Sequence, residues 1–232
     1  MTEPTGRELE HFDGNAPLFP LPNSVLFPQI LLPLHIFEPR YREMVEAAWS
    51  GDRLIAMGLV KPGFEALYET KHAEVFDVVC LGHLSALERL PDGRFYVMLR
   101  GLCRAKIVAQ LDDENAYRTV RLEVLEDRVV ETSYIDRDRR RAELIDEFRG
   151  LSPEMNLDQH LVQALDADLP LGVLCDILAF ALPLPPSDRQ RVLESLDTDE
   201  RSELLLTSLR ELRRAPTDDS SDPPFPPKFS VN

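Results

Sequence analysis

Residues 18–44 restrict the fold of this chain more than any other stretch, because prolines interrupt a strongly apolar run, LFPLPNSVLFPQILLPLHIFEPRYREM. Proline lacks a backbone N–H donor and fixes φ, so this density of prolines excludes a regular helix or a central strand. The apolar side chains between them still require burial. The sequence therefore predicts short extended pieces that bend at the prolines and pack inward. The prolines are Pro20, Pro22, Pro28, Pro33 and Pro39.

The composition is that of a globular protein with a substantial core: 232 residues, of which 44% are hydrophobic and 29% charged. No segment approaches the roughly 18–20 apolar residues of a membrane span, so no membrane partner is expected. The first residues, MTEPTGRELEHFDG, are too acidic and polar for a signal peptide. Three widely spaced cysteines are interpreted as reduced thiols of a cytoplasmic protein: Cys80, Cys103 and Cys175.

The chain is acidic, with 41 aspartates and glutamates, 26 lysines and arginines, and a formal net charge of −15. Such a surface repels phosphate backbones, which disfavours nucleic acid as a partner. The sequence DRDRRR at residues 136–141 is a basic exception. It lacks interleaved aromatic residues for base stacking, so we interpret it as a solvated helix face rather than a nucleic-acid patch.

Patterns typical of β-strands dominate up to about residue 130. The turn sequence LPDGR at 90–94 predicts a hairpin that joins strands at 82–90 and 94–100. Gly101 then predicts a bulge or bend. Many short strands with turn signals favour a barrel-like or sandwich sheet. The other expected strands are 53–60, 75–84, 102–109 and 120–124.

One helix interrupts this half of the chain. Pro39 suits the first position of a helix, where its missing N–H costs nothing. The apolar residues that follow fall on one helical stripe. They are Tyr41, Met44, Val45 and Ala48.

From about residue 131 the apolar period becomes helical, with stripes at 144–148, 157–165 and 173–181. The sequence SDRQ at 187–190 is typical of a capping box and predicts a helix start. The last helix should begin at Asp197 or Thr198. The acidic, proline-rich residues 215–232 are expected to be a disordered tail, and residues 1–15 a flexible N-terminus.

Several of these segments resemble the Lon substrate-binding domain, the N-terminal domain of ATP-dependent Lon proteases, which also occurs as a stand-alone bacterial protein. The run at 18–44 is similar to the opening strand and loop of that family. LGHL at 81–84 and RGLCRAKI at 100–107 are similar to two of its glycine-containing strands. Residues 174–212 resemble its helical part, including the pattern D-x-x-A-x-x-L that begins at Asp176.

The resemblance implies an α+β fold. A PUA-like β pseudo-barrel with one inserted helix would occupy residues 16–130, and a helical bundle would occupy 131–214. The positions that match the family signatures are expected to be mainly structural. They are Pro20, Phe27, Pro28, Pro33, His35, Phe37, Glu38, Arg40, Tyr41, Gly82, Gly101, Arg104 and Asp176.

The resemblance also bears on catalysis, because a Lon protease carries an ATPase module and a serine–lysine protease module after this domain. This sequence contains no Gly-Lys dipeptide, which excludes the phosphate-binding P-loop pattern. None of its four lysines lies in a recognisable Lon protease motif. We therefore expect a stand-alone, non-catalytic protein without catalytic residues and without a cofactor.

Two polar groups suggest chemistry and also have structural interpretations. Cys80 and His83 have a C-x-x-H spacing, but no fourth ligand is apparent, so a buried thiol is favoured over a metal site. His35 beside Glu38 suits proton transfer. We favour a structural role instead, in which Glu38 caps the helix that starts at Pro39 while His35 and Arg40 bind backbone carbonyls.

Two classes of function remain open. The resemblance implies a module that binds proteins or unfolded peptide segments, in a groove between barrel and bundle or by adding a strand at a sheet edge. Self-association is a further expectation. The loop with Pro62, Phe64 and Tyr68 is our candidate partner-binding surface. The alternative is a PUA-like domain that binds a small molecule or RNA, an analogy of fold alone.

Overall fold

The computed structural model describes residues 8–112, 114–129, 135–151, 165 and 167–214. They fall into two compact units, the first ending at Glu126 and the second beginning at Asp127. The expected tail at 215–232 and the first seven residues lie outside the described part. The described helices and strands confirm an α+β fold. Among the described helices, none has the length and apolar character needed to cross a bilayer.

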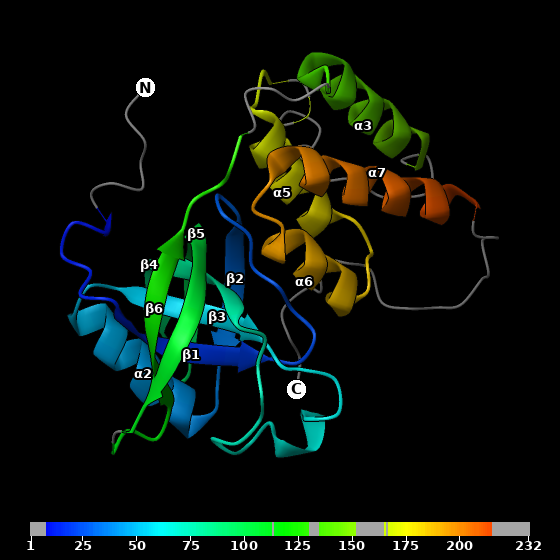
Figure 1. The fold of residues 1–232 in the computed structure, drawn as a ribbon. Coiled ribbons are helices and arrows are strands. Elements are labelled where there is room, and N and C mark those ends of the chain that lie inside the picture. The colour runs from blue at the N-terminus through cyan, green and yellow to red at the C-terminus, as the bar shows by residue number, and fades with distance from the viewer. Residues whose placement is uncertain (1–7, 113, 130–134, 152–164, 166, 215–232) are drawn as a thin grey trace. The chain divides into compact units, whose positions relative to one another are not determined.

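The first unit contains a six-stranded sheet: β1 (Asn15–Leu21), β2 (Leu31–Ile36), β3 (Leu54–Leu59), β4 (Val78–Arg89), β5 (Phe95–Leu111) and β6 (Arg118–Leu125) (Figure 1). Strand β1 pairs in parallel with β3 and antiparallel with β6. Strand β5 pairs with β4 and also with β6. Neighbouring strands therefore lead from β1 through β3, β4, β5 and β6 back to β1, which is a closed pseudo-barrel. Strand β2 lies outside this ring, beside the first half of β5.

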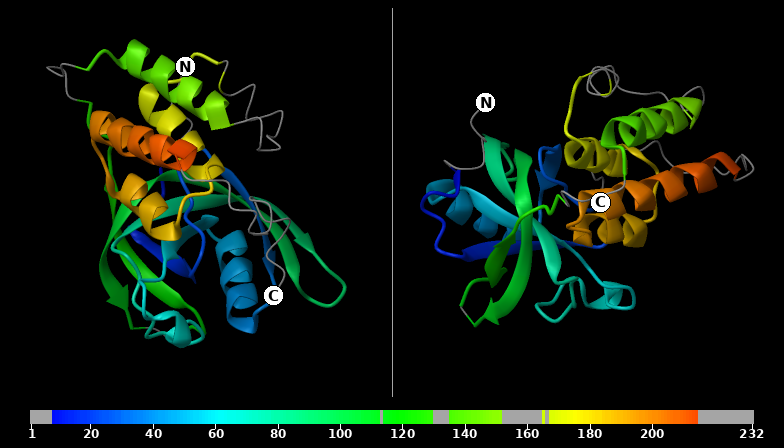
Figure 2. Two further views of the ribbon diagram at one scale, coloured as in Figure 1. Left: turned by 90° about the vertical axis from the view of Figure 1, so that its right-hand side faces the viewer. Right: turned by 45° about the horizontal axis from the view of Figure 1, so that its top comes forward.

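Apolar side chains fill the interior of the ring. Leu9 and Phe12, which precede β1 in the chain, pack against them. Helix α2 (Pro39–Ser50) adds a second layer, and Pro39 occupies its first turn as expected. The curved β4–β5 ribbon passes beside α2 (Figure 2). The buried face of α2 confirms the predicted stripe: Tyr41, Met44, Val45 and Ala48. The interior of the ring includes Leu18, Leu54, Ala56, Leu81, Ala105 and Val120.

The proline-rich run folds tightly against β5 at Gly101. A Cβ atom on Gly101 would lie 2.1 Å from the carbonyl oxygen of Phe27, so only glycine fits. Gln29 adopts a positive φ of 67°, and its N–H donates to the Gly101 carbonyl over 2.9 Å. The Gly101 N–H in turn donates to the Ile30 carbonyl, also over 2.9 Å. This β-bulge fixes the register in which β2 enters the sheet. The shift of pairing opposite Gly82 confirms the irregularity expected at Gly101.

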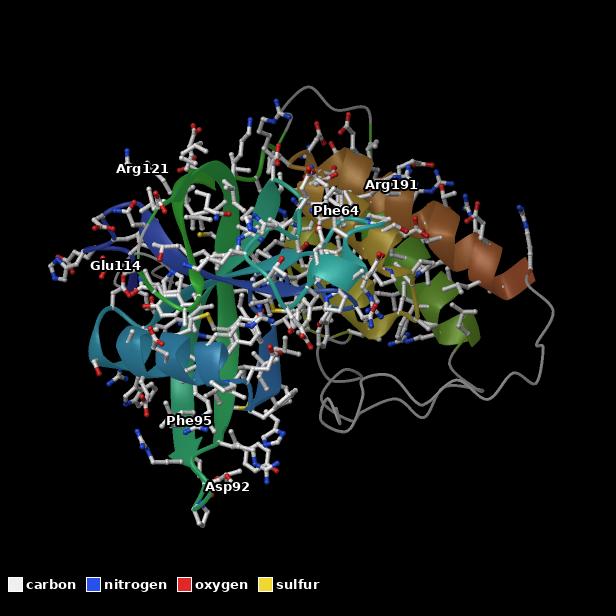
Figure 3. All side chains as sticks on the ribbon, turned by 90° about the horizontal axis from the view of Figure 1, so that it is seen from below. Phe64, Asp92, Phe95, Glu114, Arg121 and Arg191 are labelled. Carbon is white, nitrogen blue, oxygen red and sulfur yellow. The ribbon has the colours of Figure 1, made fainter. Side chains whose placement is uncertain are left out.

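The hairpin predicted from LPDGR is confirmed. The Gly93 N–H donates to the Leu90 carbonyl over 2.9 Å, and the Leu90 N–H donates to the Arg94 carbonyl over 2.8 Å. Gly93 has a φ of 82°, which favours glycine. Figure 3 shows Asp92 at the tip of this hairpin and Phe95 where β5 begins.

The second unit contains α3 (Arg137–Leu151), α5 (Leu171–Ala181), α6 (Pro186–Glu194) and α7 (Thr198–Arg214). Helix α5 is apolar on most sides and contacts α3, α6 and α7, which confirms its central place. The start of α7 at Thr198 is confirmed. The prediction of a capping box at 187–190 is wrong. Helix α6 already begins at Pro186, and proline is well suited to the first turn of a helix. Of the stripe at 157–165, only Leu165 is described, and it is buried.

Most arginines of the basic sequence at 136–141 form ion pairs. Arg137 donates to both carboxylate oxygens of Asp199 on α7 over 2.9 and 2.8 Å. Arg140 donates to Glu203 over 2.5 Å, and Arg141 pairs with Asp168. These arginines are half-buried and paired with acidic residues from distant parts of the sequence, whereas Asp136, Asp138 and Arg139 are exposed, as expected for a solvated helix face.

Candidate functional site

An exposed apolar surface lies on one face of β2 and its neighbours; we call it the β2 face. Residues that pair directly across two strands project to the same side of the sheet. Pro33 pairs with Met98 and His35 with Tyr96 on β5. On the other side of β5, Met98 pairs with Ala86 of β4. The apolar and aromatic members of the β2 face are Leu31, Pro33, His35, Ala86, Tyr96 and Met98; by the same pairing, Arg100 lies beside Leu31 and Glu88 beside Tyr96.

The exposure of this face distinguishes it from the opposite side of the same strands. Leu31 is 52% exposed and Tyr96 38%, and both belong to the small set of large apolar side chains that are exposed among the described residues. By contrast, Ile36 and Phe95, which pair with each other and project to the other side, are 2% and 1% exposed. The His35 ring lies 4.9 Å from the Tyr96 ring and 5.9 Å from that of Phe37. The β2 face thus has an aromatic centre, formed by His35 and Tyr96.

A polar cluster of Glu38, Arg40, Tyr41 and Tyr68 lies at the N-terminus of α2. The Glu38 side chain makes no capping hydrogen bond, so the expected side-chain cap is wrong. Arg40 instead donates two hydrogen bonds to one Glu38 oxygen, over 2.9 and 2.7 Å, and Tyr68 donates to the other over 3.0 Å. Arg40 also donates to the Tyr68 carbonyl over 3.0 Å, as expected for a residue that binds backbone. Both Glu38 oxygens are therefore engaged, which leaves little scope for proton transfer with His35.

Burial controls the protonation of the tyrosines in this cluster. It raises the pKa of the Tyr41 hydroxyl to about 12, with Arg40 opposing the shift. Burial also raises the pKa of Tyr68 well above its ordinary value, and Tyr41 and Glu38 add to that shift. Tyr41 is only 3% exposed, and its hydroxyl makes no well-formed hydrogen bond within the described residues, although the nearby Tyr68 hydroxyl lowers its pKa in part. Both phenols therefore remain neutral at physiological pH.

The loop proposed from sequence as a partner-binding surface is partly packed. Phe64 and Tyr68 are half-buried against the ring interior, while Pro62 is exposed. Leu67, in the short helix η1 (Glu65–Leu67), is 41% exposed and was not singled out in the sequence. Phe64 and the hairpin tip at Asp92 lie well apart in Figure 3. A role for this loop in partner binding stays a prediction.

The Cys80 region does not resemble a metal site. Among the described residues, no group of three or more His, Cys, Asp or Glu side chains is arranged to hold a metal ion. Cys80 is fully buried. Burial raises the pKa of the Cys103 thiol to about 11 and lowers the pKa of His83. The described part of the chain thus offers no reactive thiolate at this position.

The remaining signature positions lie inside the two units. Pro20 and Phe27 are buried and Pro28 is half-buried in the first unit. A Cβ at Gly82 would lie 2.9 Å from the Leu99 side chain. Arg104 is buried in β5, and Asp176 is buried in α5, 3.4 Å from the Arg201 guanidinium. These placements agree with structural roles.

A sequence profile of the ATP-dependent protease La (LON) substrate-binding domain matches residues 15–211. The chain belongs to this family. A Lon protease of Dictyoglomus thermophilum is 29% identical over 186 residues, and that of Escherichia coli strain K12 is 27% identical over 199 residues. These matches cover 80% and 83% of this chain. The chain spans about a quarter of these relatives, 23% and 24% of their lengths.

Solved structures of Lon N-terminal domains share the fold. The N-terminal domain of a Mycobacterium avium complex Lon protease superposes with a TM-score of 0.64 at 14% identity, covering 85% of this chain and 98% of that one. A Lon N-terminal domain protein from Xanthomonas campestris gives 0.61 at 22% identity, covering 83% and 97%. These likenesses confirm the Lon N-terminal fold, and the family supports a substrate-recognition module as the coarse function.

Proposed function

We propose that this chain recognises proteins by binding exposed apolar segments of unfolded polypeptides on the β2 face. The observation that carries the proposal is that Leu31 and Tyr96 are exposed on one face of the sheet, within a chain of the Lon substrate-binding family. Soluble proteins seldom expose contiguous apolar surface without a partner for it. Burial of a fully exposed leucine or aromatic side chain contributes about 1.5–3 kcal/mol. Because Leu31 and Tyr96 are already partly buried, their contribution is smaller, which supports weak, reversible binding.

The proposal assigns no catalytic reaction to the described residues. The groups best suited to proton transfer are engaged or buried, since Arg40 and Tyr68 occupy the Glu38 carboxylate. The RNA-binding alternative is disfavoured because Arg137 and Arg140 are paired with acidic side chains and the net charge is −15. A cytoplasmic location forms part of the proposal. Its support is that the three cysteines are present without disulfides.

The test is fluorescence anisotropy of a labelled, permanently unfolded protein, such as reduced and carboxymethylated lactalbumin, titrated with the purified chain. We expect saturable binding that Leu31→Ser with Tyr96→Ser weakens by about tenfold, which corresponds to roughly 1.4 kcal/mol. Folded lactalbumin should not bind. The matched control is Val108→Ser with Val124→Ser, which removes apolar side chains of similar exposure, 51% and 39%, on β5 and β6 of the first unit.

Two results would contradict the proposal. One is equal weakening by the β2-face pair and the control pair, which would show that exposed apolar area matters and its location does not. The other is a wild-type chain that fails to bind the unfolded protein. A variant carrying Pro62→Ser and Phe64→Ser tests the contribution of the loop separately. Circular dichroism spectra and melting temperatures establish that each variant is folded.

A further inference from the structure

One edge of strand β2 has no neighbouring strand, and this edge suggests how a partner segment is bound. The inference rests on the proposed function. Within the described residues, β2 pairs with β5 on one side and with no strand on the other. Every strand of the closed ring, in contrast, has a neighbour on each side. An unpaired edge presents a row of backbone N–H and C=O groups that a further strand can use.

The bulge at Gln29 determines which β2 residues present those groups. The Gly101 N–H donates to the Ile30 carbonyl. In an antiparallel pair, hydrogen-bonded and non-hydrogen-bonded positions alternate. Leu32 and Leu34 therefore direct their backbone groups toward β5, as does Ile36. The residues between them, Leu31, Pro33 and His35, direct theirs outward.

Pro33 occupies the middle of this outward set, where a proline does not disturb the ladder with β5. Because it lacks an N–H, the edge offers donors only at Leu31 and His35, with acceptors at all three positions. Proline in such a place limits open-ended pairing of strands. The edge thus suits a short segment that makes a few backbone hydrogen bonds, and it does not suit a long additional strand.

We propose that β2 binds its partner by strand addition: a short extended segment pairs with the outward backbone groups of Leu31 and His35. Its alternate side chains continue the β2 face next to Leu31, Pro33 and His35. The favoured segment alternates apolar with basic residues. Basic residues suit the net charge of −15. The same charge opposes pairing between two copies of this chain.

The first experiment uses a labelled peptide of about eight residues in which valine alternates with lysine, a sequence of high strand propensity. Two further versions carry backbone N-methyl groups at every second residue, one on the valines and the other on the lysines. Strand addition uses the N–H groups of one set only. We expect one version to bind about tenfold more weakly than the parent and the other to bind within about twofold.

The second experiment changes donors on the edge itself. Leu31→Pro removes an outward N–H, and Leu31→Ala is its control for the lost side chain. We expect the proline variant to bind the parent peptide about fivefold more weakly than the alanine variant. Pro33→Val adds the missing donor while keeping apolar bulk, and should bind about fivefold more tightly. In the wild-type complex, hydrogen exchange at the Leu31 and His35 amides should slow, while exchange at Glu114 in a surface loop stays unchanged.

The outcomes separate the two proposals. Equal binding of both N-methylated peptides and the parent would overturn strand addition and leave apolar docking on the β2 face intact. Failure of the wild type to bind either this peptide or unfolded protein would overturn both. A concentration-dependent doubling of mass for the wild-type chain, abolished by Leu31→Pro, would instead assign the edge to a second copy and overturn the partner segment.

Discussion

Arg201 of α7 makes a bidentate ion pair with Asp127, the first residue of the second unit. Its two terminal nitrogens donate to the two Asp127 oxygens over 2.8 and 2.5 Å, and the guanidinium also donates to the Ser195 carbonyl over 3.0 and 2.8 Å. The Arg201 side chain is fully buried, and Asp176 lies 3.4 Å away. A buried charge with this many partners fixes the positions of α5, α7 and the chain after β6.

Arg201→Ala should therefore destabilise the second unit strongly. Removal of one member of a buried ion pair costs about 3–5 kcal/mol, because the carboxylates left behind lose their partner. Urea unfolding followed by circular dichroism measures this change. Arg191→Ala is the matched control, since that arginine is exposed and its contact with Asp188 is 3.9 Å long; it should shift stability by less than about 0.5 kcal/mol. Similar losses in both variants would refute the assigned role of Arg201.

Gly101→Ala should destabilise the first unit by about 2 kcal/mol or more, since its Cβ would meet the rigid Phe27 carbonyl at 2.1 Å. Backbone on both sides of this contact must move for the methyl group to fit. The control is Gly51→Ala, whose Cβ would have ordinary contacts of 3.6 Å and longer. Thermal unfolding compares the two. Equal melting temperatures would show that the loop at Phe27 yields easily.

Tyr41→Phe and Tyr68→Phe should change stability in opposite directions. The Tyr41 hydroxyl is buried without a well-formed hydrogen bond, so its removal should relieve about 1 kcal/mol of desolvation cost. The Tyr68 hydroxyl donates to Glu38, so its removal should cost about 1 kcal/mol. Urea titrations at neutral pH measure both. A destabilised Tyr41→Phe variant would mean that a bound water or another group satisfies that hydroxyl.

The stability of the first unit should fall at alkaline pH. The pKa of Tyr41 rises from 10.0 to about 12 in the folded chain. Between these values the unfolded chain loses its phenolic proton while the folded chain keeps it, so unfolding becomes more favourable as pH rises above 10. The loss should reach about 2–3 kcal/mol near pH 12, and Tyr41→Phe should reduce it. An equal decline in wild type and variant would assign the effect elsewhere.

A substitution of Glu147 in α3 tests how much the surface ion pairs between α3 and α7 contribute to stability. It binds Arg213 and Arg210, and the hydrogen bond from Arg213 holds its pKa below the ordinary value. Because the folded pKa is depressed, this contribution is present above about pH 4.5 and fades as pH falls through the folded pKa. Glu147→Gln should cost about 0.5 kcal/mol at low salt and less at 1 M salt, where screening is strong. A loss that is independent of salt would contradict an ionic origin.

Local patterns predicted the elements that depend on neighbouring residues. LPDGR specified its hairpin because the turn needs glycine at one position, and the stripe after Pro39 specified the buried face of α2. The start of α6 was missed because two signals competed, and proline at the first turn prevailed over SDRQ. The side-chain cap at Glu38 failed because Arg40 and Tyr68 offer that carboxylate stronger partners.

The candidate site depends on relationships that sequence patterns do not contain. The sequence predicts that the run at 18–44 packs inward, whereas Leu31 and Pro33 are exposed. Their continuation through Tyr96 and Met98 follows only from the register of β2 against β5. Likewise, nothing near Arg201 in the sequence identifies Asp127 as its partner, because 74 positions separate them. Pairings of this kind are determined by the tertiary fold as a whole.

The closed ring also has a consequence for how the chain is made. Its last seam joins β1 to β6, where Asn15 lies opposite Arg121, 106 positions further along the chain. Contacts between such distant residues form slowly, because a long loop must close before any of them is gained. During synthesis the apolar interior therefore stays open until β6 has left the ribosome. A protein that we propose binds unfolded chains thus passes through a stage in which it resembles them.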